Sequence, residues 1–234
     1  MHFRGDLILK TDKKISIVIA DDDTIVRRGL VSLLSLNEEF EIVGEAENGR
    51  EAVELTLSKD PDVVLMDIGM PILNGIEATR QIRKQAPHVK VLILSGYDND
   101  EYILQVIQCG ANGYILKNSM LEDLYTAIRS VKKGQAFFSP SVSKVIVDSY
   151  VNRPSSSGGG AEQKKTTRLL TTREREILQL ISEGHLHQQI AERLSISVRT
   201  VDTHRNNIMK KLDLHDTASL VTYAIKNGIV IMRR

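Results

Sequence analysis

The sequence predicts an α/β domain with a parallel sheet, followed by a smaller all-helical domain. Short apolar runs of the kind found in buried strands alternate with segments of helical spacing in the first half of the chain. Polar residues stand where several of these runs end, and from residue 170 onward only helical spacing is found. The chain has 234 residues, which is enough for two modest domains.

Five βα units are predicted between Ile15 and about Lys133. The helix after the fifth strand shows its spacing in Leu124, Ile128 and Val131. Strands that alternate with helices form parallel, doubly wound sheets, so we expect five parallel strands with helices on both faces. The expected strands are 15–20, 40–46, 62–66, 89–94 and 113–116.

Four polar positions follow the ends of predicted strands. They are the acidic run that begins with Asp21 and Asp22, then Asp67, Ser95 and Lys117. The carboxyl ends of the strands of a parallel sheet open onto one crevice, so these side chains should meet there. Carboxylates, a hydroxyl and an ammonium at one point suit a hard divalent cation and a phosphoryl group.

Residues 1–14 form an N-terminal extension in this interpretation, residues 15–133 the α/β domain and residues 134–166 a linker. A short helix could form over 141–151. Residues 153–165 contain Pro, Ser and a Gly triplet without periodicity, which is typical of a flexible linker. The triplet lacks the Lys-Ser/Thr ending and the preceding strand of a phosphate-binding loop.

Residues 167–234 are predicted to form four helices. Thr171 and Glu174 have the spacing of a capping box, and Gly228 is the expected stop of the last helix. Ser197 can cap a third helix that runs to about Leu212 and exposes a polar, partly basic face. A short helix, a tight turn and this third helix describe a helix-turn-helix. A generic helical bundle with a solvated face is the alternative that the pattern leaves open.

Charge separates the two parts of the chain. Residues 164–234 hold 13 Lys/Arg against 7 Asp/Glu, and the remainder holds 18 against 23, although the net charge is only +1. A basic tail suggests binding to nucleic acid or another anion, with ordinary solvated surface as the alternative. Cys109 is the only cysteine, which excludes an intramolecular disulfide and a multi-thiolate zinc site. No stretch is apolar and long enough to span a bilayer, so we expect a soluble, cytoplasmic protein that does not enter a membrane.

Several segments resemble a known family. The first domain contains IVIADDDTIVRRGL, VVLMDIGMP, LILSG and GYILKN, which resemble the signature segments of two-component receiver domains. The second contains LTTREREILQLISEGHLHQQIAERLSISVRTVDTHRNNIMKKL, which resembles the LuxR-type helix-turn-helix. Together they resemble a response regulator of the NarL/FixJ type, which implies a flavodoxin-like receiver and a transcription regulator, not an enzyme.

The resemblance implies a phosphoryl-transfer site. Asp67 matches the phosphoacceptor, whose carboxylate takes a phosphoryl group from a sensor histidine kinase. Asp21 and Asp22 match the acidic pair that holds Mg²⁺, with further oxygens from Asp67 and from the backbone carbonyl of Gly69. Lys117 matches the lysine that pairs with the phosphoryl oxygens.

Two further residues match the family's conformational switch. Ser95 matches the hydroxyl that moves to bind the phosphoryl group, and Tyr114 the aromatic ring that turns inward with it; plain packing is the alternative for Tyr114. The chain departs from the family at Asp23, where histidine is usual, and at His185 and His187, where lysine or asparagine are common. For this histidine pair, contact with DNA phosphates or plain solvation is favoured over a metal site. The absence of a side chain at Gly69 leaves the lifetime of the phosphoryl group open.

For the second domain the resemblance implies promoter binding by a homodimer that forms on phosphorylation. We expect double-stranded DNA with inverted repeats, and RNA polymerase is a further candidate partner. The unphosphorylated receiver is expected to obstruct the recognition helix at least part of the time, and the last helix to pair two copies through Leu220, Val221, Ala224 and Ile225. The residues expected near DNA are Ser197, Arg199, Thr200, Asp202, Thr203, Arg205, Asn206, Lys210 and Lys211.

Two other functions compete with this one. A phosphohydrolase of the haloacid-dehalogenase type would use Asp21 as nucleophile with Asp23, Ser95 and Lys117. That class also needs an acidic pair in a loop after the lysine, but Glu122-Asp123 lie in a predicted helix, and Asp67 would have no role. A receiver with an RNA-binding output is the other alternative, against which the helix-turn-helix spacing argues.

Overall fold

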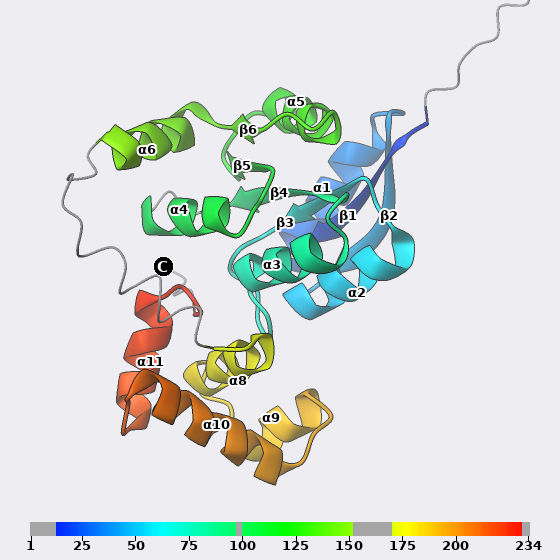
Figure 1. The fold of residues 1–234 in the computed structure, drawn as a ribbon. Coiled ribbons are helices and arrows are strands. Elements are labelled where there is room, and N and C mark those ends of the chain that lie inside the picture. The colour runs from blue at the N-terminus through cyan, green and yellow to red at the C-terminus, as the bar shows by residue number, and fades with distance from the viewer. Residues whose placement is uncertain (1–12, 97–99, 152–169, 231–234) are drawn as a thin grey trace, which may run out of the picture.

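The chain folds into two units (Figure 1). Side-chain hydrogen bonds and ion pairs join them. The computed structural model describes residues 13–96, 100–151 and 170–230. We call residues 13–151 the sheet domain and residues 170–230 the helical domain. In the part of the chain that is described, no helix has the length and apolar character needed to cross a bilayer.

The sheet domain is built on six parallel strands in the order β2-β1-β3-β4-β5-β6. Every residue of β3 is buried because helices cover both faces of the sheet, which explains why the central strands are uninterrupted apolar runs. The strands are β1 (Ile15–Ala20), β2 (Phe40–Ala46), β3 (Val63–Met66), β4 (Lys90–Ser95), β5 (Gly113–Leu116) and β6 (Phe137–Phe138).

Helices cover the two faces in the doubly wound manner that was predicted. One core cluster joins the sheet to α2, α3, α4 and α6, and a second joins it to α1 and α5. Figure 1 shows α2, α3 and α4 on the side of the sheet that faces the helical domain. The helices are α1 (Thr24–Ser35), α2 (Gly49–Lys59), α3 (Gly75–Gln85), α4 (Asp100–Gln108), α5 (Leu121–Lys132) and α6 (Pro140–Val151).

The five predicted strands are present, but the prediction of a five-stranded sheet misses β6. This strand has two half-buried residues that pair with Gly113 and Tyr114, too short for an alternation to be visible in sequence. The short helix that was expected over 141–151 is α6, and it packs against α4 with Val142 fully buried. The sheet domain therefore continues past residue 133, and the predicted flexible segment 153–165 lies outside the described residues.

The helical domain has its own core, to which all four of its helices contribute. The predicted capping box of Thr171 and Glu174 is confirmed, Ser197 caps the third helix, and Gly228 follows the fourth with a φ of 63°. The helices are α8 (Thr172–Ser182), α9 (His187–Arg193), α10 (Val198–Leu212) and α11 (Thr217–Lys226).

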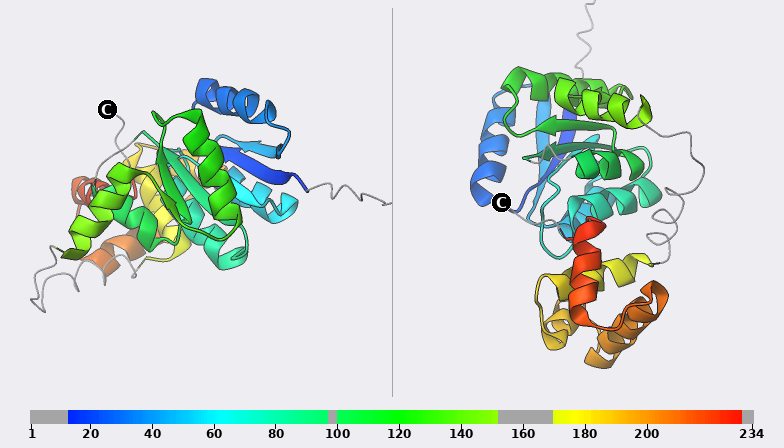
Figure 2. Two further views of the ribbon diagram at one scale, coloured as in Figure 1. Left: turned by 90° about the horizontal axis from the view of Figure 1, so that it is seen from above. Right: turned by 90° about the vertical axis from the view of Figure 1, so that its left-hand side faces the viewer.

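The two domains meet through α8 and the residues that follow α11. Arg50 on α2 bonds Glu176 on α8 at 2.7 Å, and the Asn74 amide donates to the Ile229 carbonyl at 2.7 Å. The right-hand view of Figure 2 agrees with Figure 1 that α8 is nearer to the sheet domain than α10. Helix α10, which was predicted to recognise DNA, therefore lies at the end of the molecule away from the sheet domain.

Candidate functional site

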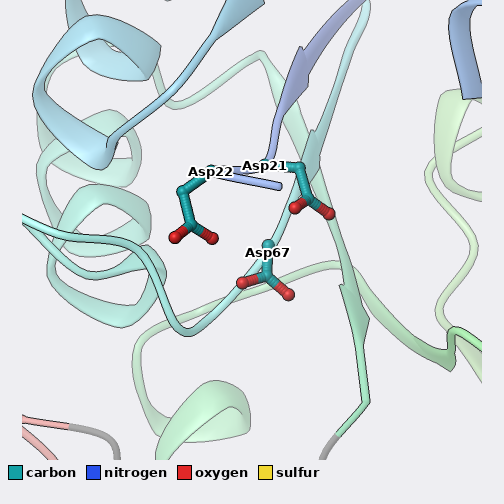
Figure 3. Close-up of side chains that lie close together, drawn as sticks. All are labelled: Asp21, Asp22 and Asp67. Atoms are coloured by element: carbon teal, nitrogen blue, oxygen red, sulfur yellow. The ribbon is translucent and has the colours of Figure 1, made fainter. Parts of the chain in front are cut away.

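Strand register brings the predicted carboxylates together. Ala20 on β1 pairs with Met66 on β3, so the residues that follow, Asp21 and Asp67, emerge side by side at the carboxyl edge of the sheet. Asp21 is 2% exposed and Asp67 is 5% exposed. With half-buried Asp22 they form a cluster in which one oxygen from each lies within 4.8 Å of the others (Figure 3). These oxygens are close enough to hold a hard cation together.

Lys117 connects the two buried carboxylates. Its Nζ lies 2.6 Å from Asp21 Oδ2 and 2.9 Å from Asp67 Oδ1, because β5 ends beside them. Burial raises the pKa of Asp21, and the neighbouring Asp67 adds to this effect while Lys117 opposes it. Burial acts to lower the pKa of Lys117, but its interactions with Asp67 and Asp21 outweigh burial and raise that pKa. The ammonium is thus held charged beside the cluster.

The second oxygen of Asp67 is also engaged. Asp67 Oδ2 accepts a hydrogen bond from the Gly69 backbone N–H at 2.8 Å, while Oδ1 faces Lys117. Helix α3 begins directly against this residue at Gly75, where a Cβ would collide with the Asp67 carbonyl oxygen. Only glycine permits this close approach. The loop from Asp67 to Gly75 is therefore tightly confined at both ends.

Ser95 and Tyr114 lie on the two neighbouring strands, and both are fully buried. Ser95 ends β4, and its carbonyl accepts the backbone N–H of Lys117 at 2.9 Å. Tyr114 pairs with Ile93 in the register of β4 and β5, and its side chain belongs to the core cluster that includes α4. The predicted hydroxyl and ring therefore lie on adjacent strands that lead to the carboxylates.

Sequence reasoning missed two roles next to the site. Arg27 on α1 is buried and donates from Nη1 to the Asp21 carbonyl at 2.7 Å and from Nη2 to Glu47 at 2.7 Å, so it fixes the backbone of the acidic run. Asp23 caps α1 by accepting the N–H groups of Ile25 and Val26 at 2.8 and 3.3 Å. Its carboxylate thus serves the helix start and is not part of the acidic cluster. Asp before a helical run is a capping signal that the sequence carried, whereas nothing marked Arg27.

The outer face of α10 is exposed. In this structure the contacts between the domains run through α8 and the end of α11 and not through this face. The expectation that the receiver obstructs the helix at least part of the time stays a prediction. The residues that face solvent include Ser197, Arg199, Asp202, Thr203, Asn206, Lys210 and Lys211, while Thr200 and Arg205 are half-buried.

Some predicted DNA contacts have intramolecular partners. Lys211 Nζ binds Glu174 on α8 at 2.7 Å, and Asp202 receives His187 Nδ1 at 2.6 Å. His187 thus pairs with a carboxylate on α10, where plain solvation or phosphate contact was expected. The predicted apolar stripe of α11 is also incomplete, because Leu220 and Ala224 are buried in the domain core. Only half-buried Val221 and Ile225 remain accessible from that stripe.

Comparison with known proteins places both domains. Residues 17–129 match the response regulator receiver domain, and residues 168–224 match the bacterial regulatory proteins of the luxR family. The chain is 40% identical over 230 residues to the transcriptional regulatory protein DegU of Brevibacillus brevis, covering 95% of this chain and 98% of DegU. It is 40% identical over 215 residues to the oxygen regulatory protein NreC of Staphylococcus haemolyticus, covering 92% and 98%. Among solved structures, RcsB of Salmonella enterica serovar Typhimurium, bound to the promoter P1flhDC with the phosphomimetic BeF3−, has 26% identity and a TM-score of 0.54, covering 93% of this chain and all of RcsB.

Proposed function

The chain belongs to the two-component response regulators of the NarL/FixJ type, which join a receiver domain to a LuxR-type DNA-binding domain, and on this basis we propose that phosphorylation of Asp67 controls its binding to promoters. The sheet domain is the receiver and the helical domain is the DNA-binding domain. The observation that carries the proposal is the set of charged groups at the strand ends: Asp67 beside Asp21, Asp22 and the ammonium of Lys117.

In the proposed reaction an oxygen of Asp67 attacks the phosphorus of a phosphohistidine on a sensor kinase. The Asp67 O–P bond forms, the N–P bond of the donor breaks, and the histidine nitrogen keeps the electron pair and takes up a proton. Lys117 already touches the acceptor carboxylate and can follow the phosphoryl oxygens as their charge arrives. Ser95, one strand away, would then offer its hydroxyl to the same oxygens. The ring of Tyr114, which was expected to turn inward with it, is already fully buried in this structure.

The acidic cluster fits Mg²⁺, because its donors are carboxylate oxygens that lie close together. Asp21, Asp22 and Asp67 would hold the ion, with the Gly69 carbonyl as a further oxygen ligand. When bound, the ion would offset the repulsion between the carboxylates and the incoming phosphoryl group.

The DNA-binding proposal rests on the exposed face of α10. Thr203 and Asn206 are proposed to reach base edges in the major groove together with Asp202 and Arg205, and Lys210 to contact phosphate. Ser197, Arg199 and Thr200 would lie at the start of the helix beside the backbone. RcsB has been solved as two dimers bound to two parallel DNAs. We propose by analogy that two phosphorylated copies of this chain bind an inverted repeat in the cytoplasm, with RNA polymerase as a candidate partner.

The phosphorylation site can be tested with acetyl phosphate and Mg²⁺. Intact-mass and peptide mass spectrometry should find one phosphoryl group on Asp67 in the native chain and none in Asp67→Asn. Asp23→Asn is the matched control, because asparagine also caps helices and Asp23 lies outside the cluster. This control should be labelled at a rate close to that of the native chain. Labelling of Asp67→Asn at the native rate would contradict the assignment.

A further inference from the structure

A side chain of the DNA-binding domain holds the loop that follows the phosphoacceptor. Gln179 on α8 is 2% exposed, and its Oε1 accepts the backbone N–H of Asn74 at 2.9 Å. Its Nε2 donates to the Met70 carbonyl at 3.1 Å and to Glu183 Oε1 on its own domain at 2.7 Å. One amide group therefore bridges the two ends of the segment Met70–Asn74. We call this segment the acceptor loop.

The middle of the acceptor loop has an unfavourable backbone conformation. Ile72 has a φ of 69°, a region that β-branched residues rarely adopt. Such a conformation costs on the order of 1–3 kcal/mol and persists only where the surroundings enforce it. The Gln179 amide bonds the chain on both sides of Ile72, at Met70 and at Asn74.

The sheet domain holds the same loop through two backbone bonds, from the Leu73 N–H to the Pro71 carbonyl at 2.7 Å and from the Gly49 N–H to the Leu73 carbonyl at 2.9 Å. Gln179 adds a hold from the other domain.

The acceptor loop directly follows the backbone N–H group that is hydrogen-bonded to the Asp67 carboxylate. Gly69 directly precedes Met70, and the Gly69 N–H donates to Asp67 Oδ2. Lys117 faces Oδ1, so both oxygens of the nucleophile are engaged in this state. A donor hydrogen bond lowers the nucleophilicity of the oxygen that accepts it. Gly69 must therefore move relative to Asp67, or turn its N–H toward the incoming phosphoryl group, before Oδ2 is released.

The rest of the interface is polar and holds Gln179 in place. Glu77 on α3 and Glu176 on α8 are both buried, and each carboxylate binds one arginine from its own helix and one from the other domain. Glu77 binds Arg80 and Arg175, and Glu176 binds Arg173 and Arg50. Interfaces of this polar kind separate more readily than apolar ones, so the docked state can open.

We propose that Gln179 is a positioning residue for the phosphoryl-transfer site: while it holds the acceptor loop, the docked DNA-binding domain slows phosphorylation of Asp67. Because coupling between two sites is reciprocal, phosphorylation must in turn weaken the docking. Phosphorylation would then change whether Gln179 binds the acceptor loop. It would not change the exposure of α10, because the outer face of this helix is already exposed in the docked state. This inference rests on the proposed phosphorylation of Asp67.

The test compares the full-length chain with Gln179→Glu, which keeps the size and one acceptor oxygen but replaces the amide that donates to Met70 and to Glu183 with a second acceptor. The rate of Asp67 labelling by acetyl phosphate with Mg²⁺ is followed by intact-mass spectrometry, and domain separation by small-angle X-ray scattering. We expect the variant to be labelled about fivefold faster or more, the lower end of typical coupling between sites, and to have a larger radius of gyration. Gln188→Glu is the matched control, because it makes the same change at an exposed position of the same domain and should alter neither quantity.

A second variant weakens the docking from the receiver side. Asn74→Asp keeps the oxygen that caps α3 through the Glu77 N–H, but it turns an oxygen toward the carbonyls of Gly228 and Ile229, which now accept from the Asn74 amide. Asn74→Asp should also increase the rate of Asp67 labelling and the radius of gyration. If Gln179→Glu does not fold, Asn74→Asp alone tests whether docking slows the labelling.

The outcomes separate the two proposals. A native chain that is not labelled at Asp67 contradicts the proposed function itself. A native chain that is labelled, with folded variants that are labelled no faster than it, overturns the positioning role of Gln179 whether or not the domains separate.

Discussion

Lys210 and Lys211 are neighbours at the end of α10, but their side chains have different partners. Lys211 binds the buried carboxylate of Glu174 on α8, whereas Lys210 is exposed and the structure gives it no such ion pair among the residues it describes. A cation that faces solvent is available for a DNA phosphate, while Lys211 must first leave a partner. The two lysines look equivalent in the sequence, but in the structure they differ in their availability for DNA.

We predict that Lys210→Ala weakens binding to all DNA sequences alike. Each phosphate contact adds about one unit to the slope of log affinity against log salt, so the slope should fall by about one unit. Fluorescence anisotropy with operator and random DNA over a salt series measures both effects. Lys211→Ala, the adjacent control, should change the slope less and lower the melting temperature more; the reverse order would contradict the assignment.

Thr203 should affect sequence preference instead of general affinity. Its hydroxyl donates to the Arg199 carbonyl one turn earlier, which leaves its methyl group on the exposed face of α10. A methyl group at a base edge contributes to discrimination of about 1–3 kcal/mol per position. Selection of binding sites from a random pool by Thr203→Ala and by the native chain should give different base preferences. Identical preferences would remove Thr203 from the readout surface.

At the scale of elements, α8 belongs to the core of the helical domain and bonds to the receiver through polar side chains. Glu174 caps this helix through the Thr171 backbone N–H at 2.7 Å and also binds Lys211 of α10. Burial acts to raise the pKa of Glu174, but the bonds to Lys211 and Thr171 outweigh it, and the pKa lies below its ordinary value. The Glu174 carboxylate thus links α8, which contacts the receiver, to α10, which is proposed to bind DNA.

Glu174→Gln should destabilise the helical domain by about 1–2 kcal/mol at neutral pH, because the capping oxygen remains but the charge-assisted bond to Lys211 is lost. A carboxyl group whose pKa is lowered by folding contributes stability above its unfolded-state pKa, near 4.5, and loses it as the pH falls through the lower folded-state pKa. The difference in thermal stability between variant and native chain should therefore be constant above pH 5 and shrink in acid. A difference that grows below pH 4 would contradict this account.

The elements themselves were largely predictable, and the contacts between them were not. The five long strands and their helices follow from apolar periodicity, and the site residues follow from the rule that parallel strands open onto one edge. Strand β6 has only two residues, too few to show a period. Gln179 and Asn74 carry no pattern at all, because polar residues that bond across a domain interface look like ordinary surface residues in sequence. The unusual φ of Ile72 is also set by its surroundings and not by its side chain.

At the scale of the whole molecule, the docked state leaves the recognition surface open but fixes its orientation. In Figure 1 and in the right-hand view of Figure 2 the helical domain lies against one side of the receiver, through α8, with α10 away from it. Two such rigid copies must place both α10 helices in successive major grooves to read an inverted repeat, which requires half-sites about one helical turn apart. Fixed docking of the two domains therefore hinders two copies from binding an inverted repeat together more than it hinders one copy from binding a single half-site.

This distinction gives a prediction for DNA of two designs. On a duplex with a single half-site, the unphosphorylated and the phosphorylated chain should bind with similar affinity, because α10 is exposed before phosphorylation. On a duplex with an inverted repeat, phosphorylation should raise the affinity by about a hundredfold or more, the gain that comes when the second binding event becomes intramolecular. Anisotropy titrations of both duplexes at one salt concentration provide the measurement, with Asp67→Asn treated in the same way as the control that should show no gain. A large gain on the single half-site would mean that phosphorylation uncovers the recognition helix, whereas a gain confined to the repeat means that it frees two helical domains to pair.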